Sequence, residues 1–118
     1  MSRVLVVCND LIFQAKIKGT AEGLGINIRL VGAGGSVQAE QGVERILIDL
    51  NAPGTQSNDL IRLRQAFPAP CQIVAFGSHV DVPRLRSARE AGCDLVLPRS
   101  SFVEELVALV NPEVPLPA

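Results

Sequence analysis

The residues best suited to chemistry in this sequence of 118 residues stand directly after its apolar runs. Asp49 ends the run ILID, Cys8 ends VLVVC, and Arg99 follows LVLP. A carboxylate in such a place could accept a phosphoryl group, bind a metal ion or pair with a cation. A thiol could act as a nucleophile if a base lay within hydrogen-bond reach. Which of these chemistries is possible depends on the strands and helices that position the three residues.

Apolar and helical segments alternate along the chain, which is the pattern of an α/β protein. Runs rich in Val, Ile and Leu predict five buried strands, at 3–7, 26–31, 44–50, 71–77 and 94–98. Segments with helical spacing predict four longer helices, at 10–25, 57–67, 81–92 and 101–110. Between the second and third strands, the glycine-rich segment has room only for a short or irregular helix.

Polar residues and glycines at the ends of these segments predict where the helices begin and end. The expected N-caps are Asp10, Ser57 or Asn58, Asp81, and Ser101 with Glu104 in an S-x-x-E capping box. The expected stops are Gly23 or Gly25 for the first helix and Gly92 for the helix at 81–92. We expect one domain at 1–111, followed by a loose, Pro-rich tail at 112–118.

Right-handed crossovers between five parallel strands favour a flavodoxin-like sheet with the order 2-1-3-4-5. Helices cover both faces of such a sheet, so the expected architecture is a three-layer sandwich. The functional site of this fold lies at the carboxyl ends of the strands, where residues distant in sequence meet. We therefore expect one shallow pocket around Asp49, lined by Cys8, Asn9, Asp10, Asn51, Gly77, Ser78, His79 and Arg99.

Composition narrows the classes of partner. A net charge of -1 gives no general attraction to nucleic acid or to anionic membranes. The N-terminus lacks a signal-peptide pattern and no apolar run is long enough to span a bilayer, so we expect a cytoplasmic protein. The three cysteines form no CxxC pair, which predicts buried thiols rather than disulfides. A single histidine gives no metal-ligand spacing.

Two segments resemble the receiver domain of two-component response regulators (CheY-like), and the resemblance covers nearly the whole chain. ILIDLNAPG, at 46–54, resembles the phosphoacceptor segment of that family, in which hydrophobic residues precede D-x-N-x-P-G. AREAGCDLVLPRS, at 88–100, resembles its A-x-x-A-G-A-x-x-Y-L-x-K-P segment. The resemblance implies that Asp49 takes the phosphoacceptor position. In the family, a histidine kinase supplies the phosphoryl group, and two acids after the first strand help to bind Mg²⁺.

The sequence departs from the family at most positions around this aspartate. The family has two acids after the first strand, a Thr or Ser after the fourth, an aromatic residue on the fifth, and Lys–Pro after it. The residues at these places are Cys8 and Asn9, Gly77, Val96, and Pro98–Arg99. Mg²⁺ prefers hard anionic oxygen ligands, which neither a thiol nor an amide supplies. The departures predict a degenerate receiver without conventional Mg²⁺-dependent phosphorylation of Asp49.

Three functions are compatible with this pocket. The first is a stand-alone signalling module that is not an enzyme, has no cofactor or catalytic residue, and acts through protein contacts. The second is a receiver that is still phosphorylated at Asp49 with Mg²⁺. The third is a small α/β enzyme or ligand-binding protein that uses Cys8, Asp49, His79 and Arg99. Arg99 either grips Asp49 with its guanidinium or points into water, and the sequence leaves both arrangements open.

Two further features of the sequence suggest contacts with other molecules. Arg84, Arg86 and Arg89 lie on the helix at 81–92, and arginine is enriched at interaction surfaces. The family that the chain resembles uses the corresponding face to dimerise or to bind partners, so we expect a signalling protein or a second copy there. The segment GAGGS, at 32–36, lacks the G-x-G-x-x-G spacing of a dinucleotide site, which favours a flexible turn over a phosphate cradle.

Overall fold

Five parallel strands form one sheet in the order β2-β1-β3-β4-β5, as the sequence predicts. A computed structural model describes residues 2–117 of the chain. The strands are β1 (Val4–Val7), β2 (Ile28–Val31), β3 (Arg45–Asp49), β4 (Gln72–Gly77) and β5 (Leu95–Pro98). Each strand pair is parallel, so all of the carboxyl ends lie at the same edge of the sheet.

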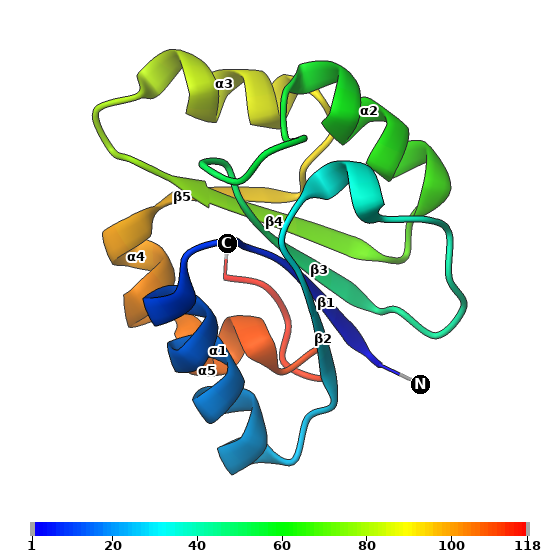
Figure 1. Cartoon of the computed structure of the whole chain (residues 1–118), viewed down its shortest axis with the longest axis vertical. Coiled ribbons are helices and arrows are strands. Elements are labelled where there is room, and N and C mark those ends of the chain that lie inside the picture. The colour runs from blue at the N-terminus through cyan, green and yellow to red at the C-terminus, as the bar shows by residue number, and fades with distance from the viewer. Residues whose placement is uncertain (1, 118) are drawn as a thin grey trace.

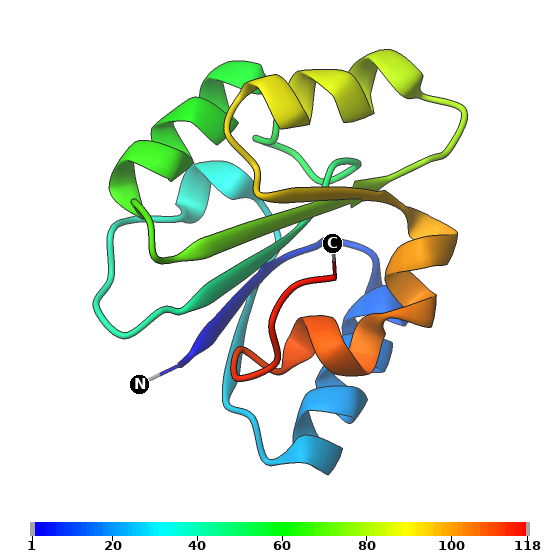
Figure 2. The ribbon, with the colours of Figure 1, turned by 180° about the vertical axis from the view of Figure 1, so that it is seen from behind.

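Helices cover both faces of the sheet, which completes the predicted three-layer sandwich (Figures 1 and 2). One face packs against α1 (Leu11–Leu24), α4 (Arg99–Glu104) and α5 (Leu106–Val110). The other face packs against α2 (Ser57–Ala66) and α3 (Val82–Glu90), with the 3₁₀ turn η1 (Gly34–Ser36) beside them. The expected short helix after β2 is therefore this single turn.

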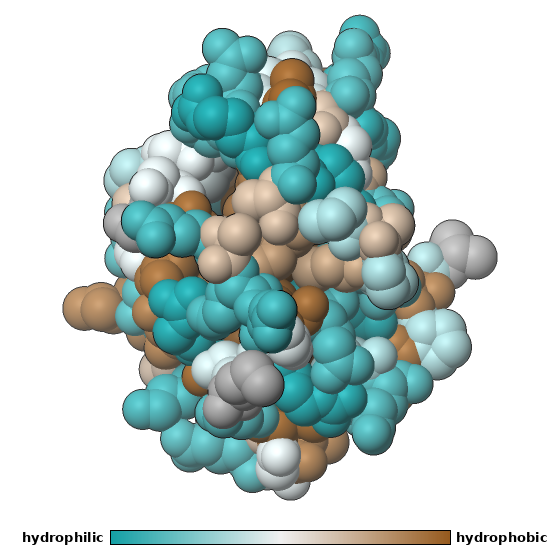
Figure 3. Space-filling view, turned by 90° about the vertical axis from the view of Figure 1, so that its right-hand side faces the viewer, coloured by the Kyte–Doolittle hydropathy of each residue, from teal (hydrophilic) through white to brown (hydrophobic). Residues whose placement is uncertain are grey.

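Mostly aliphatic side chains fill the core on both faces of the sheet. Alternate residues of β1 point to opposite faces: Leu5 and Val7 join the layer of α2 and α3, and Val4 and Val6 join the layer of α1 and α5. The surface on the right-hand side of Figure 1 is mostly hydrophilic, with smaller apolar areas between the polar ones (Figure 3). No helix within residues 2–117 is long and apolar enough to cross a membrane.

Most of the predicted helix ends are confirmed. The carboxylate of Asp10 accepts hydrogen bonds from the backbone N–H groups of Ile12 (2.9 Å) and Phe13 (3.1 Å). Asp81 caps α3 in the same way through the N–H of Arg84, at 3.2 Å. The C-cap of α1 is Gly25, whose φ of 70° is a conformation that favours glycine.

Two of the predicted caps are wrong. The last helix begins at Arg99 with Pro98 as its N-cap, so Ser101 lies inside the first turn and forms no capping box. That helix is also broken at Glu105, which separates α4 from α5. In α2 the N-cap is Gln56 rather than Ser57 or Asn58. The N–H of Gln56 donates to the carboxylate of Asp59 three residues later, at 3.0 Å.

The glycines of the segment GAGGS serve backbone packing. The N–H of Gly34 donates to the carbonyl of Pro53 at 2.8 Å, which ties η1 to the loop after β3. A Cβ atom on Gly34 would lie only 2.0 Å from the carbonyl oxygen of Gly54. The close approach of two backbones therefore explains why glycine is needed there.

Arg45 binds the chain just after α5, including Val114 in the first half of the Pro-rich tail. This arginine at the start of β3 is 1% exposed. Its guanidinium donates to the side chain of Gln72 (2.6 and 3.0 Å) and to four backbone carbonyls. The carbonyls belong to Ala108, Leu109, Asn111 and Val114. Arg45, which the sequence predicts only as part of the strand at 44–50, thus fixes the end of α5 and the residues that follow it as far as Val114.

Candidate functional site

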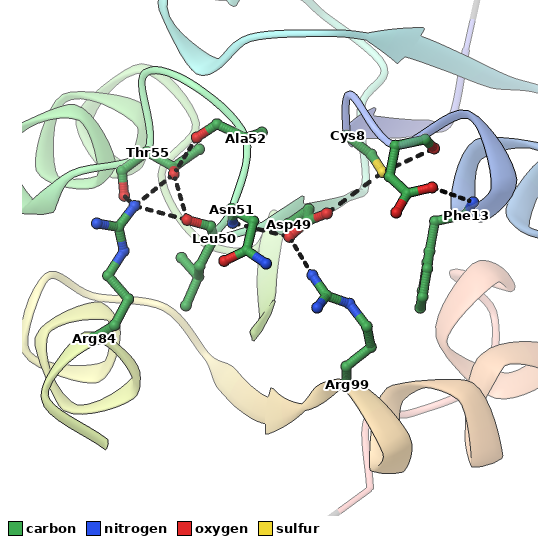
Figure 4. A network of polar contacts seen from close by, with 10 residues as sticks. Cys8, Phe13, Asp49, Leu50, Asn51, Ala52, Thr55, Arg84 and Arg99 are labelled. Atoms are coloured by element: carbon green, nitrogen blue, oxygen red, sulfur yellow. Dashed lines mark hydrogen bonds and ion pairs between the residues drawn. The ribbon is translucent and has the colours of Figure 1, made fainter. Parts of the chain in front are cut away.

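The carboxylate of Asp49 is the centre of the candidate site at the carboxyl edge of the sheet. It ends β3, and its side chain is only 2% exposed. One oxygen, Oδ1, accepts a hydrogen bond from Nη2 of Arg99 at 2.7 Å and another from the N–H of Asn51 at 2.9 Å. The other oxygen, Oδ2, lies 3.7 Å from the thiol of Cys8 (Figure 4). The structure therefore shows the ion pair between Asp49 and Arg99 that the sequence left open.

Two aromatic rings hold Arg99 against this carboxylate. Its guanidinium carbon lies 5.3 Å from the ring centre of Phe13 on α1 and 5.7 Å from that of Phe76 on β4. Both distances allow a cation–π attraction. Phe76 in turn stacks on Phe102 of α4 at 3.8 Å. Arg99 follows Pro98 and begins α4, so the strand exit aims its side chain across the pocket.

Cys8 has the properties of a neutral thiol in this site. Its side chain is fully buried, and it can donate to the Asp49 carboxylate or to the carbonyl of Asp10, each at 3.7 Å. Burial, with a smaller contribution from the nearby negative charge of Asp49, raises the pKa of the Cys8 thiol to about 11. The thiolate is the form that attacks substrates and binds metals. Cys8 is therefore a weak hydrogen-bond donor to Asp49 at neutral pH.

The structure brings together only part of the predicted pocket. Cys8, Asp49, Arg99 and the backbone of Asn51 meet, while Asp10 is used as the cap of α1. His79 and Asn9 are exposed, and neither side chain makes a hydrogen bond or an ion pair within residues 2–117. The hydroxyl of Ser78 accepts from the N–H of Val80 at 3.4 Å, and Gly77 packs on Leu50.

Arg84 is turned inward, which corrects its assignment to the predicted interaction face. Its Nη2 donates to the carbonyl of Leu50 at 2.7 Å and to the hydroxyl of Thr55 at 3.0 Å (Figure 4). Thr55 is itself buried and donates to the carbonyl of Ala52. This network fastens the loop after Asp49 to α3. Of the three arginines on α3, only Arg86 and Arg89 are exposed.

Sequence reasoning missed the two rings that hold Arg99. Phe13 and Phe76 read as ordinary apolar residues of a helix and a strand, and no spacing signal connects them with Arg99. Only the neighbouring positions of α1, β4 and α4 in the folded chain bring the rings and the guanidinium together. The proximity of Asp49 and Arg99 could be predicted from the sequence, because the carboxyl ends of parallel strands are neighbours.

The residues around Asp49 do not fit a Mg²⁺ ion. Mg²⁺ needs several oxygen ligands in near-octahedral geometry, and usually one or two of these are carboxylates. Asp10 is committed to the helix cap, Cys8 is a protonated sulfur, and Arg99 places a positive charge on Asp49. Within residues 2–117, no group of three or more His, Cys, Asp or Glu side chains could hold a metal ion.

A surface pocket of about 270 Å³ lies away from Asp49, between η1 and α2. Gly34, Val37 and Leu63 are among the residues that line it, and the ion pair of Arg62 with Asp59 (2.6 Å) stands at its side. None of the residues predicted to act chemically contributes to this pocket. It therefore adds nothing to the ligand-binding alternative that rests on Cys8, His79 and Arg99.

Comparisons with known proteins place the fold. No family model matches the sequence, and no curated protein matches it significantly. Solved structures match well. A response-regulator receiver domain protein from Clostridium thermocellum superposes with a TM-score of 0.75 at 14% identity, over 97% of this chain and 94% of the other.

Two further solved structures show the same similarity. The receiver domain of Ssk1 from Saccharomyces cerevisiae, solved with the phosphotransfer protein Ypd1, gives a TM-score of 0.74 at 19% identity, covering 98% of this chain and 92% of that one. The receiver domain of a sensor histidine kinase from Pseudomonas aeruginosa, solved with a coordinated magnesium ion, gives 0.71 at 19%, covering 93% and 98%. The chain therefore has the fold of CheY-like receiver domains over nearly its whole length.

Proposed function

We propose that this protein is a receiver-like signalling module that acts through protein contacts and does not use conventional phosphorylation of Asp49. The observation that carries the proposal is the ion pair of Asp49 with Arg99, at 2.7 Å in a site whose carboxylate is 2% exposed. The fold supplies the phosphoacceptor position, and the residues around it supply a cation in place of a metal.

The electrostatics of phosphoryl transfer support this reading. Transfer to an aspartate develops negative charge on the phosphoryl oxygens, which a metal ion and positioned cations must stabilise. The guanidinium of Arg99 is always protonated and is already bound to one carboxylate oxygen of Asp49. Without an acid pair beside it, the site has neither the metal ligands nor a free carboxylate. Asp49 is thus held in one paired state.

Two alternatives have weaker support. Phosphorylation of Asp49 would require Arg99 to leave both the carboxylate and the rings of Phe13 and Phe76. An enzyme that used Cys8 would need its thiolate, whose formation burial opposes at neutral pH. Protein contact is favoured by the fold, since the structurally similar receiver domain of Ssk1 was solved in complex with Ypd1.

The experiment is to offer the protein a phosphoryl donor under conditions that suit receivers. We expect no change in intact mass with acetyl phosphate and Mg²⁺, and no shift of the Asp49 region in NMR spectra with beryllofluoride and Mg²⁺. A Cys8→Asp, Asn9→Asp, Arg99→Lys variant restores the acids and the lysine, and should gain a Mg²⁺-dependent response at Asp49. Ready, Mg²⁺-dependent modification of the wild-type chain, lost in Asp49→Asn, would contradict the proposal.

A further inference from the structure

Arg84 on α3 is an inward-facing cation without a negatively charged partner. Its Nη2 atom donates to the carbonyl of Leu50 (2.7 Å), to the hydroxyl of Thr55 (3.0 Å) and to the carbonyl of Thr55 (3.4 Å). Arg64 and Arg99 also bind groups inside the fold, but each forms an ion pair with an aspartate. Among the residues that the structure describes, Arg84 forms no ion pair. Its positive charge is therefore held only by neutral groups.

The inward position also leaves part of this guanidinium unused. The Nε atom of Arg84 is buried and has no hydrogen-bond partner within residues 2–117. The same atom is unpaired in Arg64 and Arg99, but an aspartate neutralises the charge of each. Arg45 also lacks a carboxylate, yet its Nε, Nη1 and Nη2 atoms all donate. Of these four arginines, Arg84 has the weakest set of partners, and a carboxylate would add an opposite charge and two parallel hydrogen bonds.

A single peptide group connects Arg84 with the carboxylate of Asp49. The peptide between Leu50 and Asn51 is planar, so its C=O and N–H groups turn together. Its C=O accepts from Arg84 at 2.7 Å, and its N–H donates to Oδ1 of Asp49 at 2.9 Å (Figure 4). The same Oδ1 atom accepts from Arg99 at 2.7 Å. A continuous chain of hydrogen bonds therefore runs from α3 to the ion pair of Asp49.

The charge of α3 indicates the kind of partner that would compete for Arg84. The helix carries three arginines and one glutamate, and Arg86 and Arg89 are exposed. Such a positive surface attracts an acidic partner. Arg84 is itself partly exposed, so a carboxylate has access to its guanidinium from solvent. An acidic partner thus offers Arg84 the counter-ion that the fold does not supply.

We propose that Arg84 is a latch on the Asp49 site, and that a protein with an acidic surface releases it by binding its guanidinium. With Arg84 inward, the peptide after Leu50 is fixed and the N–H of Asn51 stays on Asp49. With Arg84 bound to the partner, this peptide is free to turn and Asp49 loses that donor. The role of the partner in signalling rests on the proposed function, but the latch does not depend on whether Asp49 accepts a phosphoryl group.

Hydrogen exchange of the Asn51 amide, followed by NMR, tests the latch. We expect Arg84→Met to speed exchange at this amide by about tenfold or more, because the peptide loses the partner of its C=O. Arg64→Met is the matched control, since Arg64 also donates to a backbone carbonyl, that of Cys71 at 2.8 Å, but at the opposite edge of the sheet. It should leave Asn51 unchanged and speed exchange at Ile73, whose N–H donates to the aspartate that Arg64 binds. Unchanged exchange at Asn51 in Arg84→Met overturns the latch.

Hexaglutamate is the probe for the partner, and it is added to the folded wild-type chain at low ionic strength. We expect it to speed exchange at Asn51 and to shift the side-chain N–H resonances of Arg99. Arg86→Met, which removes an exposed arginine of the same helix, should keep this response, whereas Arg84→Met should lose it. Salt should reverse the effect, because it screens exposed charges.

Two results with this probe would overturn the proposal. The first is hexaglutamate that leaves exchange at Asn51 unchanged in the wild type, and the second is an equal response in Arg84→Met. The assay with acetyl phosphate decides the proposed function separately, since neither exchange measurement uses a phosphoryl donor.

Discussion

Removing Arg99 tests whether the ion pair with Asp49 holds the site together. The substitution Arg99→Met keeps most of the volume and length of the side chain but removes its charge. Asp49 is then left with a carboxylate that is 2% exposed and retains the N–H of Asn51 and the thiol of Cys8 as donors. Breaking a fully buried ion pair in this way costs about 3–5 kcal/mol.

The expected loss is smaller than that upper range, because one partner reaches water. The side chain of Arg99 is 30% exposed, so solvent screens part of the attraction. Loss of the contacts with Phe13 and Phe76 adds about 0.5–1 kcal/mol. We expect Arg99→Met to lower the free energy of unfolding by about 2 kcal/mol, and the melting temperature by about 8 °C.

The reverse substitution should cost less. In Asp49→Asn the isosteric amide no longer carries a charge, and Arg99 can turn its guanidinium toward water. We expect a loss of about 1 kcal/mol for Asp49→Asn and about 2 kcal/mol for the double variant, which leaves a coupling energy of about 1 kcal/mol. Urea unfolding followed by circular dichroism measures all four proteins. Additive losses, or a larger cost for Asp49→Asn than for Arg99→Met, would refute the reasoning.

Three further predictions address other parts of the chain. Arg45→Met should lower the free energy of unfolding by about 3 kcal/mol and remove hydrogen-exchange protection around 106–114, because four backbone carbonyls lose their donor. Gly34→Ala should destabilise the fold by about 2 kcal/mol in urea unfolding, while Gly35→Ala, with nothing within 4 Å of its Cβ, should be close to neutral. The pKa of Cys8 rises from 9.0 to about 11 on folding, so the contribution of its thiol to stability is present below pH 9 and is lost as the pH rises toward 11. Cys8→Ala should therefore flatten the fall in the free energy of unfolding between pH 9 and 11, measured by urea unfolding. The thiol of the folded wild type should also resist alkylation at neutral pH.

The sequence predicts the sheet well, because apolar runs and turns are local signals. Five runs of Val, Ile and Leu fall on the observed strands, and the handedness of crossovers leaves few orders for a parallel sheet. The meeting of Asp49, Cys8 and Arg99 follows from the same reasoning, since the residues after parallel strands share one edge. Loop residues such as His79 are less well placed, because a position after a strand does not fix the direction of a side chain.

What the sequence could not predict depends on contacts between distant elements. Arg84 reads as an exposed helix arginine until the loop after Asp49 folds against it. Arg45 reads as the charged edge of a strand, but the end of α5 supplies the carbonyl groups that allow it to be buried. Desolvation lowers the pKa of this arginine, and the bonds to the backbone compensate for the loss of water. No local pattern in the sequence identifies the acceptors that either arginine binds.

The proposed role of Asp49 has a consequence for how such a module could be regulated. A ligand shifts a conformational equilibrium only by the difference in its affinity for two states. In a phosphorylated receiver the phosphoryl group and its metal supply that difference at the aspartate. Here Arg99 is a permanent, covalently attached cation at the same carboxylate, so its presence does not vary with any signal. Regulation of such a module would then act through the amount of its binding partner or of the chain itself, because mass action sets how much complex forms.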